Sequence, residues 1–499
     1  MSARAGTRPR YALSALAAVG LGLVHAAAFW PIEHWALSIA SLAGLSALVR
    51  IALAHGASRA AAAGLGFAFA MGAFCSGLAW LFVSMHTYGG MPAVMAAAAV
   101  VLFSAYLSLY PALALGMAAA LAGRAGPLAW TGALCGTWVL TEIARGWVMT
   151  GFPWLAVGYA QLDGPLDRLA PVLGVFGVGG AAVAVAALLA EAARARRAGA
   201  SAHHDLPRAA RTRLACAALA LVGMLVPLAI PRDAWTRASG PPLDVRLIQG
   251  NVAQDMKFVP ARTLAAMRDY AERFTAGTAT LTILPETAWT APWDRTPEPV
   301  ARAILEHVAR GHTLALGLPA YAPGASGGTT RLTNSVMLIE PGRRPDPLDA
   351  TRRYDKHHLV PFGEFVPLGF RWFVDMMVIP MGDFGRGDRR QPPFEVGGQR
   401  VAFNICYEDL FGEEIREALL GDRGATVLAN VSNIAWFGRS HALPQHLAIA
   451  RLRSLETGRP MLRATNTGMT AAIDGSGRVI AVFEPQVAGV LDVRVQGTT

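Results

Sequence analysis

The segment VAFNICYED (401–409) decides the fold predicted for the second half of this chain. It opens with a short run of apolar residues typical of a buried strand and ends in a cysteine, a tyrosine and two acidic residues. Active-site groups of layered α/β domains tend to lie where a strand ends and a loop begins. Cys406 has such a place, whereas Cys75, Cys135 and Cys216 lie in long apolar runs. Cys406 is therefore the first candidate functional residue.

The sequence around this segment, from Leu243 onward, alternates between short β-branched runs and amphipathic runs. PARTLAAMRDYAERFTAG (260–277) predicts a helix that begins at proline and ends at glycine, and GEEIREALLG (412–421) predicts another. MTAAIDGSGRVIAVFE (469–484) predicts a hairpin around an Asp-Gly-Ser-Gly turn. Strands that alternate with helices and hairpins predict an α/β layered domain with a mixed sheet.

The first half of the chain is much more apolar. The whole sequence is 53% hydrophobic and 16% charged, more apolar than an ordinary soluble enzyme. A membrane helix needs roughly 20 apolar residues. Seven segments meet this requirement: 11–30, 35–55, 61–85, 91–122, 127–147, 169–193 and 214–231. The first could instead be a signal peptide, because HAAAF resembles a cleavage site. We predict a multi-pass α-helical membrane domain over 1–231, a linker over 232–242 and the α/β domain over 243–499.

The arginines predict how this membrane domain is oriented, because basic loops stay in the cytoplasm. Twelve arginines lie in the N-terminal segment and in the loops after every second predicted helix, whereas the opposite loops hold little beyond Arg145 and Arg168. Seven crossings then place residues 232–499 outside the cytoplasm. The net charge of +10 reflects these membrane flanks. Because the sequence contains no nucleic-acid-binding module, we predict no nucleic-acid partner.

Two further polar residues lie at or between predicted strand ends. Glu286 ends LTILPE (281–286), and Lys356 lies between two predicted strands. Of the 44 basic residues only two are lysines, Lys257 and Lys356. A sequence that uses arginine almost everywhere else indicates a role for a compact ammonium at Lys356. The alternative is that the lysine at position 356 was retained by chance. Lys257, the other lysine, was either retained by chance or has a second role.

Several interpretations of Cys406 are open. Taken alone, it would be a small buried hydrophobic residue. Outside the cytoplasm a thiol risks oxidation, and the predicted soluble half has no second cysteine for a pair, which leaves only an intermolecular disulfide. One cysteine and two adjacent histidines lack the spacing of a metal site. A nucleophile fits better, because the Glu286 carboxylate can take the thiol proton. The Lys356 ammonium, with Glu364 as its partner, can stabilise an oxyanion.

Four segments together resemble the catalytic segments of the nitrilase superfamily, whose members use a Glu-Lys-Cys triad. They are LPETAW (284–289), RYDKHHLVPFGEFVP (353–367), NICYEDLFG (404–412) and SNIAWFG (432–438). With the apolar half, and with RGWVMTGFPWLAVGYAQLDGPL (145–166), the resemblance extends over nearly the whole chain to the apolipoprotein N-acyltransferases, which are membrane-bound members of that superfamily. This resemblance implies a nitrilase-like αββα sandwich on the periplasmic side of a bacterial inner membrane.

The resemblance also implies the reaction and the residue roles. Glu286 would be the general base, Lys356 the oxyanion stabiliser and Cys406 the nucleophile. The supporting residues would be Glu364, Tyr407 and Glu408, with the Tyr407 backbone amide as a second oxyanion donor. Cys406 would take a fatty acyl chain from a phospholipid, typically phosphatidylethanolamine, as a thioester. It would pass the chain to the α-amino group of the diacylglyceryl-cysteine at the N-terminus of an apolipoprotein. We expect no metal or other cofactor, since the sequence has no Walker or dinucleotide-binding loop.

Three positions differ from the pattern of this family. Phe258 and Leu284 stand where tryptophan is common, and Ile434 stands where aspartate is usual. Many members also carry one more membrane helix after the soluble domain; this sequence stops at Thr499, so we expect that helix either to be absent or to lie beyond Thr499. These differences concern substrate preference and full activity rather than the triad.

Two alternative functions stay open. A membrane-tethered carbon–nitrogen hydrolase would use the same triad with water as the acceptor, although seven apolar spans are many for a tether. A transporter or lipid-binding protein would carry an inert domain of this fold, but the spans hold few of the intramembrane charges that transport sites need. GFPWLAVGY (151–159) either lines a lipid entry or belongs to an aromatic belt. Glu142 and Arg145 are predicted to form a structural ion pair.

Overall fold

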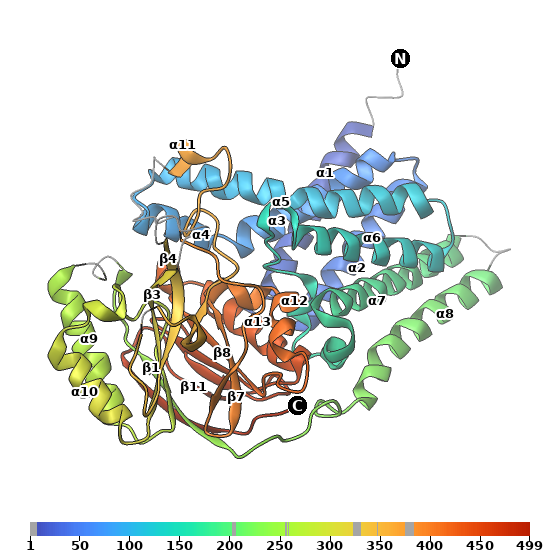
Figure 1. Ribbon diagram of the computed structural model, residues 1–499. Helices are drawn as coiled ribbons and strands as arrows, with labels where there is room; N and C mark the ends of the chain where they lie inside the picture. The colour runs from blue at the N-terminus through green and yellow to red at the C-terminus, as the bar shows by residue number, and fades with distance from the viewer. Residues whose placement is uncertain are drawn as a thin grey trace. The chain divides into compact units, whose positions relative to one another are not determined.

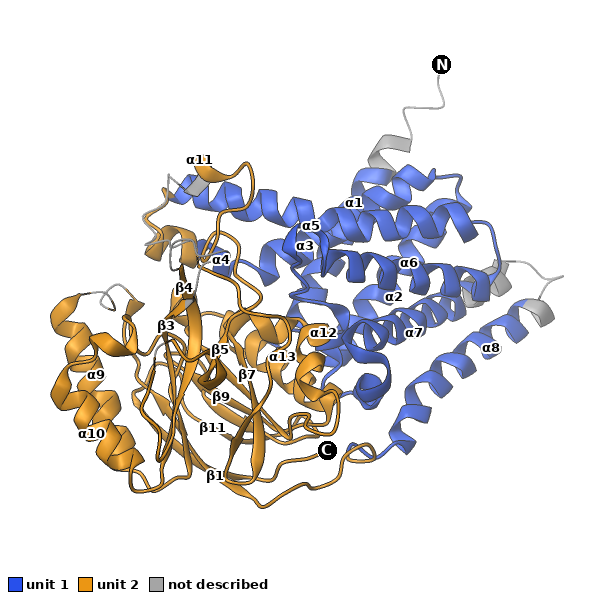
Figure 2. Cartoon of the chain, in the orientation of Figure 1, with its two compact units in different colours: residues 1–82, 93–232 blue, residues 83–92, 233–499 orange. Residues whose placement is uncertain are grey.

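The computed structural model describes residues 7–201, 206–254, 257, 259–322, 331–346, 348–374 and 384–499. The chain divides into two compact units (Figure 2). The first unit comprises Met1–Phe82 and Ala93–Arg232, and the second comprises Val83–Pro92 and Asp233–Thr499.

The described part of the first unit is built of helices (Figure 1). Its α-helices are α1 (Thr7–Ala27), α2 (Trp35–Ala54), α3 (Arg59–Gly77), α4 (Trp80–Phe82), α5 (Ala93–Ala122), α6 (Pro127–Arg145), α7 (Ala170–Ser201) and α8 (Leu206–Leu225). Its short 3-10 helices are η2 (Val148–Thr150), η3 (Val157–Gln161), η4 (Pro165–Leu169) and η5 (Val226–Ala229). Each of the seven predicted spans coincides at least in part with one of the long helices.

Five stretches of the described chain are long and apolar enough to cross a membrane: Trp35–Ala54, Arg59–Gly77, Ala93–Ala122, Pro165–Arg194 and Ala209–Ala229. They confirm a helical membrane domain in this half of the chain. The first predicted span is a shorter apolar helix, Tyr11–Ala27. The fifth corresponds to α6, which is helical but is not among the five.

The third predicted span, 61–85, is wrong at its end. Helix α3 ends at Gly77, and the next residue, Leu78, has a non-helical backbone conformation with φ −113° and ψ 13°. The chain continues through α4 into a π-helix, η1 (Val83–Tyr88), which belongs to the second unit. The composition of 78–85 is apolar, so hydropathy alone did not reveal the break.

The second unit contains two six-stranded sheets. The first has the strand order β12-β1-β2-β3-β4-β5 and the second has the order β11-β10-β9-β8-β7-β6. The strands are β1 (Leu243–Gln249), β2 (Leu281–Ile283), β3 (Thr313–Ala322), β4 (Arg331–Ile339), β5 (Arg353–Asp355), β6 (Phe394–Val396), β7 (Gln399–Ile405), β8 (Val427–Ser432), β9 (Met461–Thr465), β10 (Ala471–Ile473), β11 (Val479–Val482) and β12 (Gly489–Val495). The hairpin predicted over 469–484 is β10 and β11, which pair antiparallel.

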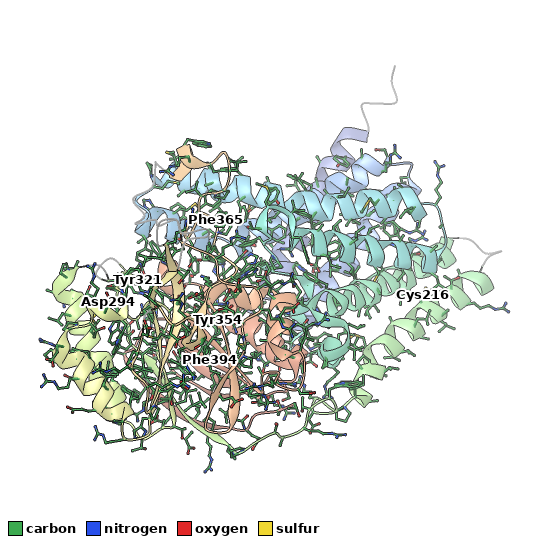
Figure 3. All side chains as sticks on the ribbon, in the orientation of Figure 1. Cys216, Asp294, Tyr321, Tyr354, Phe365 and Phe394 are labelled. Carbon is green, nitrogen blue, oxygen red and sulfur yellow. The ribbon has the colours of Figure 1, made fainter. Side chains whose placement is uncertain are left out.

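Side chains alternate across both sheets and so form three apolar layers. In β1, Leu243, Val245 and Leu247 point between the sheets, whereas Ile248 points to the opposite face. The layer between the sheets includes residues of both, among them Phe394, which is labelled in Figure 3. The unit is therefore a sandwich with its main core between two mixed sheets.

Helices cover the two outer faces of this sandwich (Figure 1). Helices α9 (Pro260–Thr275) and α10 (Glu298–Val308) pack on the first sheet, and α13 (Ala442–Thr457) packs on the second. The predicted helix 412–421 is instead a short α12 (Gly412–Ile415) followed by a 3-10 turn, η11 (Arg416–Leu419). The αββα architecture predicted for this half is confirmed.

Parallel pairing places the carboxyl ends of several strands at the same edge of their sheet. Strands β1, β2 and β3 run parallel, and so do β7, β8 and β9. Glu286 follows β2, Cys406 follows β7, and Asn433 follows β8. The carboxyl ends of parallel strands meet at one edge of a sheet, so this pairing gathers the polar residues that follow them.

Candidate active site

Glu286 lies three residues after β2, in a turn that both sheets hold in place. Gly317 in β3 leaves room for this turn, since a Cβ atom there would lie 2.2 Å from the Pro285 carbonyl oxygen. Asn334 Nδ2, from β4, donates to Glu286 Oε1 at 2.7 Å. The backbone N–H of Asn433, after β8, donates to Oε2 at 2.7 Å. The carboxylate is therefore fixed from two sides.

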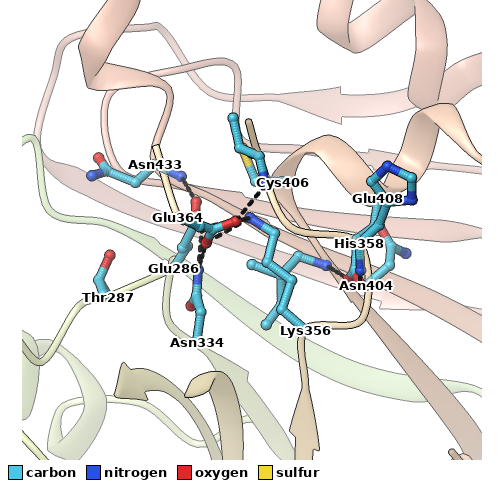
Figure 4. A network of polar contacts seen from close by, with 12 residues as sticks. Glu286, Thr287, Asn334, Lys356, His358, Glu364, Asn404, Cys406, Glu408 and Asn433 are labelled. Atoms are coloured by element: carbon cyan, nitrogen blue, oxygen red, sulfur yellow. Dashed lines mark hydrogen bonds and ion pairs between the residues drawn. The ribbon is translucent and has the colours of Figure 1, made fainter. Parts of the chain in front are cut away.

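Lys356 follows β5 and is fully buried, with 0% exposure. Its Nζ lies 3.3 Å from Glu286 Oε1 and 3.0 Å from Glu364 Oε1 (Figure 4). Asn334 Nδ2 also donates to Glu364 Oε1, at 2.6 Å, so one amide group links the two carboxylates. Burial alone would lower the pKa of Lys356, but Glu364 and Glu286 outweigh it and hold that pKa above its usual value. Lys356 is therefore an ammonium between two carboxylates.

The same contacts set the charge of Glu286. Burial alone would raise its pKa, but Lys356, the Asn334 amide and the Asn433 N–H together hold the pKa of Glu286 below its usual value. The carboxyl group is therefore ionised at neutral pH and can accept a proton.

Cys406 occupies a sharp turn directly after β7, beside this charged group (Figure 4). Its φ of 54° lies in the left-handed region, which residues other than glycine adopt rarely and keep only when their surroundings hold them. Burial and the nearby Glu286 raise the pKa of the Cys406 thiol to about 12, although Lys356 acts in the opposite direction. The resting group is therefore a neutral thiol.

Glu408 holds this turn against the segment that follows β5. Its Oε2 accepts from the N–H of Ile405 at 2.6 Å and from the hydroxyl of Tyr354 at 2.9 Å. Its Oε1 accepts from the N–H groups of His357 and His358 at 2.7 and 3.0 Å. One carboxylate thus ties the end of β7 to the segment that carries the lysine.

A buried ionic cluster supports the turn from the side of α13. Asp409 Oδ2 lies 3.0 Å from His446 Nε2 and 3.0 Å from Arg463 Nη1. His446 Nε2 also lies 3.4 Å from the backbone carbonyl oxygen of Cys406. Tyr407, between Cys406 and this cluster in the chain, is itself buried. The turn is therefore held at several points.

The structure brings Glu286, Lys356 and Glu364 into direct contact and places Cys406 in the same group. Sequence reasoning missed Asn334 and the cluster around Asp409. Asn334 had a signal, because it is a polar residue in an otherwise apolar strand, TNSVMLIE (333–340). The cluster had none, because its members come from three distant segments.

Comparisons with known proteins agree with this architecture. The model of the apolipoprotein N-acyltransferase N-terminal domain matches residues 21–188, and the carbon-nitrogen hydrolase model matches residues 244–499. An apolipoprotein N-acyltransferase of Ralstonia nicotianae is 46% identical over 96% of this chain and 86% of its own length. The chain belongs to the apolipoprotein N-acyltransferase family. Another member of this family, from Bordetella bronchiseptica, is 43% identical over 99% of this chain and 93% of its own length.

Among solved structures, a carbon-nitrogen hydrolase superfamily protein of Xanthomonas campestris matches with a TM-score of 0.37 and 19% identity. This match covers 51% of the present chain and 91% of that protein.

The positions that differ from the apolipoprotein N-acyltransferase pattern have different surroundings. Leu284 is buried in the layer between the first sheet and its helices, so it contributes to packing there. Ile434 is also buried, next to Asn433. Phe258 lies outside the described residues.

In the first unit, the aromatic segment 151–159 is largely buried. Arg145 Nη1 donates to the carbonyl oxygens of Phe152 and Trp154 at 2.8 and 2.7 Å. Glu142 Oε1 accepts from the N–H of Val157 at 3.0 Å and lies 3.7 Å from Arg145 Nη2. The ion pair therefore fastens this segment to α6.

Proposed function

We propose that this protein transfers a fatty acyl chain from a phospholipid to the α-amino group of the N-terminal diacylglyceryl-cysteine of an apolipoprotein, through a thioester on Cys406. One observation carries the proposal: Lys356 Nζ lies within 3.3 Å of both Glu286 and Glu364, beside a strained cysteine at a strand end. The chain is an acyltransferase by family, and these residues supply what acyl transfer requires.

The charges favour one assignment of roles. A neutral thiol is a poor nucleophile, and a base must remove its proton during attack. Glu286 is ionised, and it acts on Cys406 more strongly than Glu364 does, so we assign it as the general base. Lys356 carries three N–H donors, and its contacts with Glu286 and Glu364 leave capacity for an oxyanion.

In the first half-reaction, Cys406 Sγ attacks the ester carbonyl carbon of the phospholipid while Glu286 takes the thiol proton. The carbonyl oxygen becomes an oxyanion, which Lys356 and the Tyr407 backbone amide stabilise. The C–O ester bond then breaks, and Glu286 returns its proton to the departing alkoxide. The products are a thioester on Cys406 and a lysophospholipid.

In the second half-reaction, the neutral α-amino group of the diacylated apolipoprotein attacks the thioester carbonyl carbon. Glu286 takes a proton from the amine as the C–N bond forms. The C–S bond breaks, and the proton returns to the Cys406 sulfur. Atoms and charges balance without a metal ion or cofactor, and the product is an N-acylated lipoprotein.

Both substrates are anchored in a lipid bilayer, which matches a catalytic unit joined to apolar helices. We place the protein in the bacterial inner membrane with its catalytic unit in the periplasm, because the arginine-rich loops belong to the cytoplasm. Phosphatidylethanolamine is the donor that we propose.

The test is intact-mass analysis of purified protein given phosphatidylethanolamine. We expect a hydroxylamine-labile acyl adduct on the Cys406 peptide, absent from Cys406→Ala and present in Cys75→Ala, a matched control in α3. Adding a diacylated lipopeptide should discharge the adduct and yield the triacylated lipopeptide. An adduct elsewhere, or a triacylated product made by Cys406→Ala, would overturn the mechanism. Release of free fatty acid as fast as transfer would instead identify a hydrolase.

A further inference from the structure

Lys257 is the other lysine of the chain, and the reaction proposed above does not use it. Its side chain is buried, with 5% exposure. Nζ donates to Thr287 Oγ1 at 3.0 Å and lies 3.4 Å from the backbone carbonyl oxygen of Glu286. Lys257 therefore touches both sides of the peptide bond that follows the general base.

That peptide bond leads into a strained residue. Thr287 has a φ of 47°, in the left-handed region that threonine rarely adopts. Such a conformation persists only when the surrounding structure holds it. The two contacts of Lys257 act on the two residues that define this turn, so they help to fix the direction in which the Glu286 carboxylate points.

The ammonium of Lys257 also faces an unusual set of partners. Among the described residues, both of its hydrogen-bond partners are neutral oxygens, and the charged group that acts on it is Glu286. Burial lowers the pKa of Lys257 to about 8, and Glu286 offsets part of this effect. Lys257 forms no ion pair with any carboxylate that the structure describes, and a buried ammonium in such surroundings is unfavourable unless it has another use. A methionine of similar length would fill the same space without that penalty.

The other charges around Glu286 are already assigned. Lys356 faces its Oε1, and the neutral donors Asn334 and Asn433 face its two oxygens. Glu364 shares Lys356 and Asn334 with Glu286, and Cys406 belongs to the same charged group. Lys257 is thus a second positive charge near Glu286, and it comes from the segment that follows β1 instead of the segment that follows β5.

We propose that Lys257 is a positioning residue that holds the Glu286–Thr287 turn and keeps the Glu286 carboxylate ready to accept a proton at the start of each half-reaction. The inference rests on the proposed function, in which Glu286 takes and returns one proton twice in each cycle. The charge of Lys257 acts on the reaction through Glu286, and Lys257 itself does not touch the substrate.

The experiment measures the rate of acyl-adduct formation on Cys406 from pH 5 to pH 10, by rapid quenching and mass spectrometry. Lys257→Met removes the charge and keeps the length of the side chain. Because a positive neighbour favours the carboxylate, its loss should move the acid limb of the profile to higher pH. For a shift of about one pKa unit we expect a rate up to about threefold below the wild type at pH 5 and a smaller deficit near pH 8.

Two more variants separate charge from packing. Lys257→Gln is neutral but polar and should move the acid limb in the same direction as Lys257→Met. It replaces Lys257→Met as the neutral variant if Lys257→Met does not fold. Lys257→Arg keeps the charge, so its acid limb should stay with that of the wild type. Arg262→Met removes a positive charge from the exposed first turn of α9 and should leave the profile unchanged.

The results distinguish this inference from the proposed function. If the wild type forms no adduct on Cys406, the proposed function fails. If the wild type forms the adduct and the neutral variants slow it equally at every pH, Lys257 is only structural and this inference alone is overturned. An acid limb that moves in Lys257→Arg as far as in Lys257→Gln would also overturn it.

Discussion

The substitution Glu364→Gln tests whether the buried ammonium of Lys356 depends on two carboxylates. Glu364 Oε1 and Oε2 lie 3.0 and 2.9 Å from Lys356 Nζ, and Glu286 Oε1 lies at 3.3 Å. Glutamine keeps the shape but removes the charge that lies closest to the ammonium. Its single carbonyl oxygen also cannot serve both Asn334 Nδ2 and the Val360 N–H, which now donate to different oxygens of Glu364.

Removing one partner of a buried ion pair destabilises a protein by about 3–5 kcal/mol. For a domain of 150–250 residues, each kcal/mol lowers the melting temperature by about 2–4 °C. We therefore expect Glu364→Gln to melt roughly 6–20 °C below the wild type in detergent, measured by the thermal unfolding of the purified protein. The acylation rate should fall as well, because Glu286 is then the one described carboxylate in contact with Lys356 and becomes a weaker base.

The matched control is Glu340→Gln, at a partly exposed ion pair at the end of β4. Glu340 Oε2 lies 2.7 Å from Arg352 Nη1, and such pairs contribute at most about 1 kcal/mol. If the melting temperature of Glu364→Gln equals those of this control and of the wild type, Glu364 does not balance the charge of Lys356. An ammonium held between two carboxylates is then the wrong description of the site.

Two other predictions concern the triad directly. Lys356→Arg keeps the charge but changes the donor geometry in a fully buried site. Because losing one oxyanion donor costs about 2.7–4 kcal/mol, adduct formation should slow by about 10²–10³-fold. A rate within a factor of three of the wild type would contradict the role of Lys356. Because the thiol pKa is raised to about 12, alkylation of Cys406 by iodoacetamide should quicken by about tenfold per pH unit between pH 7 and pH 10, as measured on its peptide. A rate independent of pH in that range would mean that the thiolate is already present.

Much of the catalytic unit could be predicted because its signals are local. In the strand that ends at Ile405, alternate apolar residues face the layer between the sheets, and Cys406 follows at the edge of that layer. Glu286 and Cys406 were visible for the same reason, as polar residues directly behind apolar runs. The two lysines were visible because the rest of the chain uses arginine. These features depend on neighbours within a few residues.

The remaining features depend on partners that the sequence does not place. The role of Asn334 as a link between Glu286 and Glu364 requires the register of β4 beside the turns after β2 and β5. The cluster of Asp409, His446 and Arg463 forms only when α13 packs on the second sheet. The end of α3 at Gly77 was missed for a different reason, because the following residues are as apolar as the helix. Hydropathy records transfer to lipid, not backbone conformation.

The neutral thiol would resolve the difficulty that a free cysteine poses in the periplasm, where we propose that the catalytic unit lies. Oxidation and disulfide exchange proceed through the thiolate, so a thiol whose pKa is raised to about 12 reacts slowly at neutral pH. A preformed thiolate beside Lys356 would be a better resting nucleophile, but it would also be the better target for oxidants. In the mechanism that we propose, Glu286 removes this conflict, because it is ionised at rest and takes the proton only when Sγ attacks an ester. On this argument, the ammonium of Lys356 serves the oxyanion of the transition state more than the sulfur of the resting enzyme. Glu286→Gln should therefore suppress adduct formation and, because the Glu286 charge helps to raise the thiol pKa, should also make Cys406 easier to oxidise, which peptide mass spectrometry after peroxide treatment would measure.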